Sequence, residues 1–150
     1  MSRGLKRLEP VQRLKQSRER DAARALGERQ QALTAEQQRL EELLRYREDY
    51  LARYQATLDR GGLAVAALQE YRVFLDRLDQ AITQQQDAIE KTARTRDQSR
   101  DQWLATRVDA RAIDKVVAGR RRELDHQDRK REQAEMDEHA ARRGSGKGEG

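Results

Sequence analysis

The sequence contains no cysteine, and only one proline, one tryptophan and one phenylalanine among its 150 residues. Without cysteine the chain can form neither a disulfide nor a thiolate metal site. So few bulky apolar residues are too little for the core of an ordinary globular domain. No apolar run reaches the roughly 18 residues of a membrane-spanning helix, and the basic N-terminus lacks the apolar segment of a signal peptide. We therefore expect a soluble intracellular protein.

Charge is abundant instead. Charged residues make up 39% of the chain, and the net charge is +5. The excess is local: between Arg3 and Arg20 seven basic residues face only Glu9 and Glu19, which gives this span alone a charge of +5. A basic surface attracts nucleic acid, anionic lipid or an acidic protein face. High charge is also typical of disorder, so the spacing of the apolar residues has to decide between disorder and long helices.

That spacing follows a heptad pattern over most of the chain. Steps of three and four residues from Leu68 keep one phase as far as Gln127, which is typical of a coiled coil. The stripe weakens near Arg96 and Ser99 and recovers at Trp103. The seam positions of this second stretch include Leu68, Tyr71, Leu75, Leu78, Ile82, Gln85, Ile89, Ser99, Trp103, Ala110, Ile113, Val117 and Leu124. The first stretch carries a similar stripe, with three polar members, at Leu26, Gln30, Leu33, Gln37, Leu40, Leu44, Arg47, Leu51, Tyr54 and Leu58.

Gly61 and Gly62 separate the two stretches. The pattern predicts an all-α fold, a long two-helix antiparallel coiled coil in the form of a helical hairpin. Its coiled-coil domain covers residues 1–143, with helix one at about 10–59, a turn at 60–62 and helix two at about 63–140. A disordered Gly-rich tail is predicted at 144–150. Helix two should project beyond helix one beside the N-terminus. A parallel homodimer without a sharp bend is the alternative.

Residues suited to catalysis are scarce. The only histidines, His126 and His139, are thirteen apart, whereas a metal pair on one helix needs a spacing of three or four. The carboxylates around His126 lie at the spacing of ordinary pairs on a helix surface. No phosphate-binding glycine motif occurs. We expect no catalytic residue, no metal site and no cofactor, so the protein is predicted not to be an enzyme.

The aromatic residues suggest a binding surface. All four tyrosines and the phenylalanine lie between residues 46 and 74. Two stripes flank the seams and should merge near the bend, with Tyr50 level with Phe74. They consist of Leu43, Tyr46 and Tyr50 on helix one, and of Phe74, Leu78 and Ala81 on helix two, where Leu78 also belongs to the seam. An exposed apolar patch is typical of a partner site, and a widened core that stiffens the turn is the alternative.

Several of these motifs resemble the FliJ family of flagellar protein-export components. The resemblance rests on Asp21-Ala22-Ala23-Arg24 followed by Leu26-Gly27-Glu28, on Leu43, Tyr46 and Tyr50, on Tyr71, Phe74, Leu78, Ala81 and Ile82, and on Trp103 with the charged C-terminal region. It covers nearly the whole chain and keeps the order and the gaps. Gln85 departs from the histidine of some members, and Arg39 stands where glutamine is expected.

The resemblance implies an antiparallel coiled coil similar to that of the rotary ATP synthase γ subunit. It implies a stalk that binds the hexameric flagellar export ATPase and contacts the membrane export gate, with a link to export chaperones and their recycling. The implied location is the cytoplasm, at the inner face of the membrane below the flagellum. The implied gate-binding residues are Phe74, Leu78 and Ala81, supported by Leu43, Tyr46 and Tyr50.

Two other functions fit the sequence. A stalk of a related type III virulence secretion system would share the same physical features. A basic coiled coil could bind nucleic acid through the span from Arg3 to Arg20, with affinity that falls steeply with salt. The runs Arg120-Arg121-Arg122 and Arg129-Lys130-Arg131 are better explained as a solvated helix of mixed charge, so no nucleic acid is expected there.

Overall fold

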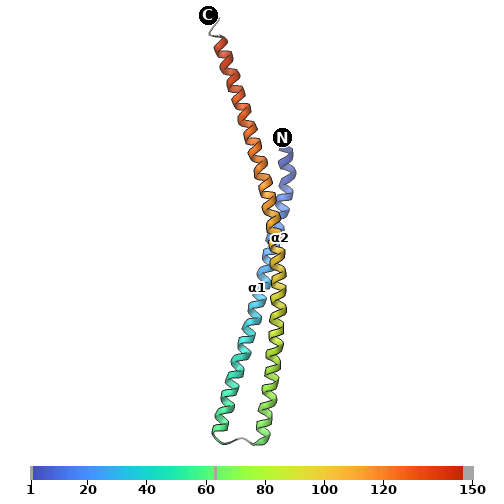
Figure 1. Cartoon of the computed structure of the whole chain (residues 1–150), viewed down its shortest axis with the longest axis vertical. Helices are drawn as coiled ribbons and strands as arrows, with labels where there is room; N and C mark the ends of the chain where they lie inside the picture. The colour runs from blue at the N-terminus through green and yellow to red at the C-terminus, as the bar shows by residue number, and fades with distance from the viewer. Residues whose placement is uncertain (1, 63, 147–150) are drawn as a thin grey trace. The chain divides into compact units, whose positions relative to one another are not determined.

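A computed structural model describes residues 2–62 and 64–146 of the chain. It contains two α-helices, α1 (Ser2–Asp59) and α2 (Val65–Gly146), which run antiparallel on either side of a short turn (Figure 1). The described residues form no strand. Because leucine, alanine, glutamine, arginine and glutamate favour helices, local preference and the seam pattern agree over both stretches. The all-α helical hairpin predicted from the sequence is confirmed.

The turn begins where α1 ends. Gly61 has a φ of +69°, in the left-handed region where a side chain would be strained. Its N–H donates to the Leu58 carbonyl at 2.9 Å, and the Arg60 N–H donates to the Ala56 carbonyl at 3.3 Å. Carbonyls at the end of α1 are thus capped by the glycine turn. The predicted turn at 60–62 lies here, and Leu63, the predicted first residue of helix two, is outside the described residues.

Both helix ends differ from the predicted boundaries. Helix α1 begins at Ser2, upstream of Pro10, which lies inside the helix. Proline removes the hydrogen bond to the carbonyl four residues before it and crowds that carbonyl, and burial of Leu5 and Leu8 against α2 offsets part of this cost. Helix α2 continues through Gly146, beyond the predicted boundary at residue 143. The Ser145 hydroxyl donates to the Arg142 carbonyl at 3.2 Å in this last turn. The rest of the predicted tail, residues 147–150, is outside the described residues.

The helices pair in two compact parts. The turn part is Asp21–Trp103. The terminal part consists of Met1–Arg20 and Leu104–Gly150. Each is described by itself below.

In the turn part, the buried residues Leu33, Leu78 and Ile82 form the apolar core, together with the polar residues Gln85 and Ser99. All five occupy the predicted seams. The Gln85 amide nitrogen donates to the Glu36 carbonyl oxygen at 2.9 Å and to the Glu36 carboxylate. Buried polar side chains need such partners, and no buried side-chain polar atom among the described residues lacks one.

In the terminal part, Ala110 and Val117 are the buried residues, and they also occupy the predicted seam. Polar contacts join the helices beside them. Gln12 donates to the Asp114 carboxylate at 2.8 Å, and the Lys15 ammonium lies 3.7 Å from the Asp109 carboxylate. Because Ala110 has a small side chain and the neighbouring contacts are polar, fewer apolar side-chain atoms are buried here than in the turn part.

Pairing in the terminal part ends near Leu124. Gly4 and Leu5 of α1 share a small hollow with Arg120, Glu123, Leu124 and Gln127 of α2. From residue 125 to residue 146 every side chain is exposed, and Figure 1 shows α2 continuing past the start of α1. The predicted projection of helix two is therefore present as a single helix of mixed charge.

Candidate functional site

Five aromatic rings gather beside the turn. Tyr54 contacts Tyr71, Tyr71 contacts Tyr50, Tyr50 contacts Phe74 and Phe74 contacts Tyr46, with ring centroids 4.9, 5.0, 4.3 and 6.0 Å apart. We call these five residues the aromatic ladder. The rings come alternately from α1 and α2, and tilted pairs at these distances stabilise each other beyond the area that they bury. The ladder occurs because seam and flank positions on both helices carry aromatic residues at the same level.

The two predicted flank stripes do meet across the helices. Phe74 lies between Tyr46 and Tyr50, as expected for a hairpin in which Tyr50 is level with Phe74. Of the predicted gate-binding residues, these three are brought together by ring contacts. Leu43 and Ala81 are half-buried on the same two helices.

Exposure divides the predicted site residues into two groups. Tyr46 is the most accessible, with 54% of its surface exposed, whereas Leu78 is only 7% exposed. Tyr50 and Phe74 are half-buried. Leu78 therefore belongs to the core, and truncating it should destabilise the coiled coil.

Val73 is a surface residue that sequence reasoning missed. It is 50% exposed and lies beside Phe74 in an open hollow on α2, lined by Ala66, Gln69, Glu70, Val73, Phe74 and Arg77. Val73 belongs to neither the seam nor the flank stripe, so heptad counting passes over it. Its signal in the sequence is a β-branched apolar residue at a position that should face water.

The ladder also affects one hydroxyl group. Partial desolvation raises the pKa of Tyr50 above its ordinary value of 10.0, and Tyr71, Tyr46 and Glu70 add to this shift by charge repulsion. Loss of the proton would place a negative charge among aromatic rings and beside a carboxylate. The Tyr50 hydroxyl is therefore neutral at physiological pH.

Gln85 does not extend this surface. It is 7% exposed and its amide points to α1, where Glu36 accepts its hydrogen bonds. Gln85, which stands where some family members carry histidine, thus stabilises the pairing of α1 with α2. Arg39, the other departure, is exposed on α1.

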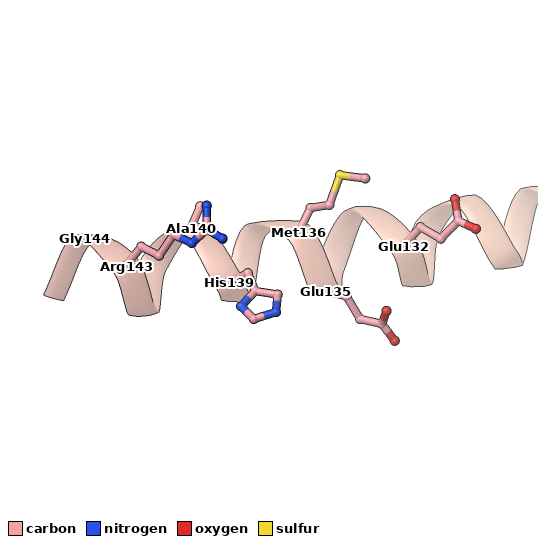
Figure 2. A pocket seen from close by; sticks show the side chains of 7 residues that line it. All are labelled: Glu132, Glu135, Met136, His139, Ala140, Arg143 and Gly144. Carbon is pink, nitrogen blue, oxygen red and sulfur yellow. The ribbon is translucent and has the colours of Figure 1, made fainter. Parts of the chain in front are cut away.

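The single helix at the end of α2 carries a second surface hollow. It is lined by Glu132, Glu135, Met136, His139, Ala140, Arg143 and Gly144, all from α2 (Figure 2). Figure 2 shows Met136 and His139 pointing to different sides of the helix. Because one helix supplies every side chain, the hollow does not enclose a ligand. Within the described residues no three histidine, aspartate or glutamate side chains are grouped to hold a metal ion.

No helix among residues 2–62 and 64–146 is long and apolar enough to cross a membrane.

The fold and the ladder define a coiled-coil protein whose candidate site is a surface formed by two helices. The family described as Flagellar FliJ protein matches residues 5–149, and the chain belongs to this family. No curated protein and no solved structure gave a match. Membership implies a component of the flagellar protein-export apparatus, and the family is a non-catalytic one.

Proposed function

We propose that the protein is a stalk and adaptor of the flagellar export apparatus, which binds the hexameric export ATPase and the membrane export gate. Family membership supports the export apparatus. The aromatic ladder is the single observation that carries the adaptor role, since it presents Tyr46 and Phe74, with Val73, at a surface that two thin helices cannot cover. The protein would act in the cytoplasm at the inner face of the membrane, and export chaperones are further candidate partners.

The proposed gate contact uses Tyr46, Phe74 and Val73, with Tyr50, Leu43 and Ala81 beside them. Aromatic side chains that are partly exposed and rigidly held are favoured anchors in protein interfaces. The ring contacts hold Phe74 in place on both sides, so a partner would lose little side-chain entropy on binding. Leu78 supports this surface from the core below it.

The proposed ATPase contact uses the terminal part. There α2 extends beyond α1 as an exposed helix with closely mixed charges. Acidic and basic side chains such as Glu138 and Arg142 already pair along it, at 3.5 Å. A helix of this kind offers charged groups on every side, which suits a stalk surrounded by several identical subunits.

Capture of both partners tests the proposal. The full chain, bound to resin, should retain the gate protein and the export ATPase of the same organism. Tyr46→Ala with Phe74→Ala should lose the gate and motility but keep the ATPase and helical circular dichroism. Val108→Ala is a matched control, since Val108 is 67% exposed in the terminal part. Gate binding that survives the double substitution would refute the ladder as the gate contact.

Truncation tests the other contact. Deleting the residues after Leu124 should weaken stimulation of the ATPase while gate binding persists. The deletion removes Gln127 from the hollow that it shares with the start of α1, and the buried residues Ala110 and Val117 stay in place. Full stimulation by the truncated chain would refute the assignment of this helix to the ATPase.

A further inference from the structure

The first five turns of α1 carry six exposed basic residues on the side away from α2. At 100° per residue, these side chains lie on the opposite side of the helix from Leu5, Leu8 and Gln12, which face α2, or on its flanks. We call them the basic face: Arg3, Lys6, Arg7, Arg13, Arg18 and Arg20. All belong to the terminal part.

Within residues 2–62 and 64–146 no ion pair neutralises the charge of the basic face. The seventh basic residue, Lys15, is different, because it turns to α2 and pairs with Asp109. Only Glu9 and Glu19 supply negative charge in the same turns. Six like charges on one helix repel each other, and an anionic surface would relieve that repulsion.

Apolar side chains lie among these charges. Leu14 is 49% exposed and Val11 is 41% exposed, and by helical geometry Leu14 falls within the arc of the basic face. No aromatic residue occurs in residues 2–20, so the face offers nothing to stack on nucleic-acid bases. Cations mixed with exposed leucine and valine are typical of helices that lie on anionic membranes, where the cations meet the headgroups and the apolar groups enter between them.

We propose that the basic face binds the surface of anionic phospholipid membranes. The face extends from residue 3 to residue 20, about 25 Å at 1.5 Å per residue, and α2 contacts the other side of this segment through Asp114 and Asp109. At 100° per residue the six side chains spread over about 160° of the helix, so Arg3 and Lys6 lie nearest the middle of the face and the others reach a bilayer from the edges of the face. This contact does not use the ladder. Because the terminal part also carries the proposed ATPase contact, the membrane contact would form in chains that are not bound to the ATPase.

Vesicle sedimentation with the full chain tests this proposal. The vesicles are pure phosphatidylcholine, or phosphatidylcholine with about one third phosphatidylglycerol. Binding should require the anionic lipid and should fall by roughly tenfold or more between about 0.05 M and 0.5 M salt. Equal binding to both kinds of vesicle, or no binding to either, would overturn the proposal.

Charge reversal provides the matched comparison. Lys6→Glu, Arg7→Glu and Arg13→Glu together should reduce binding to the anionic vesicles by roughly 100-fold or more. The control triple Arg129→Glu, Lys130→Glu and Arg131→Glu makes the same change in net charge on the exposed end of α2, and it should bind within about threefold of the parent chain. An equal loss in both triples would mean that net charge alone matters, which would contradict a localised face.

Two further measurements keep the result unambiguous. If the first triple loses helical circular dichroism, the neutral triple Lys6→Gln, Arg7→Gln and Arg13→Gln replaces it and should still lose binding by roughly tenfold.

Leu14→Ala, which keeps all charges, should weaken binding to anionic vesicles by roughly threefold and leave binding to single-stranded RNA unchanged. Tighter binding to RNA than to vesicles, with no effect of Leu14→Ala, would assign the face to nucleic acid and overturn the membrane proposal.

Discussion

The turn part and the terminal part are built from the same two helices, yet they are stabilised differently. Near the turn, five aromatic rings and the buried side chains of Leu33, Leu78 and Ile82 fill the interface. Near the termini, Ala110 and Val117 are buried beside polar contacts from Gln12 and Lys15. Because hydrophobic stabilisation follows the apolar area removed from water, the turn part should contribute more of the free energy of unfolding.

This difference also separates two kinds of surface. The turn part has apolar residues in surplus, and they make a surface suited to a protein partner. The terminal part has charge in surplus, on the basic face of α1 and on the single helix of α2. One continuous heptad pattern therefore supports two regions with different binding chemistry.

The largest effect should come from the core of the turn part. Leu78→Ala removes a buried side chain, so we expect a loss of about 2–4 kcal/mol in the free energy of unfolding. Val73→Ala, five residues earlier and half exposed, should change it by less than about 0.5 kcal/mol. Urea unfolding followed by circular dichroism measures both. Similar values for the two variants would mean that Leu78 is not in the core.

A smaller effect is expected in the terminal part. Val117 is 2% exposed and its neighbour Val116 is 48% exposed, so the two valines make a matched pair. Val117→Ala should cost about 1–2 kcal/mol, because it deletes two buried methyl groups, and Val116→Ala less than about 0.5 kcal/mol. The same urea titration is used. A loss for Val117→Ala as large as that for Leu78→Ala would remove the contrast between the parts.

The smallest effect concerns pH. The pKa of Tyr50 is raised above 10.0 in the folded chain, so the folded state holds this proton more tightly than the unfolded state. The associated stability is present below pH 10 and is lost as the pH rises further. The melting temperature should therefore fall more steeply above pH 10 in the parent chain than in Tyr50→Phe. Parallel curves for the two chains would show that the ladder does not shift this hydroxyl.

Heptad counting predicted the seam well. Each buried residue among those described, from Leu33 to Val117, occupies a position on one of the two predicted stripes. Simple periodicity works here because a two-helix interface has one seam and no competing layers. It also predicted that Tyr50 and Phe74 would be level, since the two glycines fix the centre of the hairpin.

The remaining features depend on three-dimensional detail. The extension of α1 upstream of Pro10 was not predicted, because a proline near a helix start is usually at the first turn. The exposure of Val73 was not predicted, and Leu78 was assigned both to the seam and to the binding patch, because spacing assigns a residue to a face but does not give its exposure. The hydrogen bonds from Gln85 to Glu36 depend on which residue of α1 lies opposite Gln85 and on how closely the helices approach there. The sequence pattern does not give either.

The most direct test of the central claim is a distance across the turn part. Spin labels on Glu48→Cys and Asp76→Cys use exposed positions outside the ladder, and the chain has no cysteine of its own to compete. Labelled chains are diluted with unlabelled ones, so that only distances within a chain are measured. An antiparallel hairpin predicts roughly 10–25 Å, because paired helix axes lie about 8–10 Å apart. A continuous helix, as in a parallel dimer without a bend, predicts about 42 Å for the same pair, and that result would contradict the hairpin and with it the aromatic ladder.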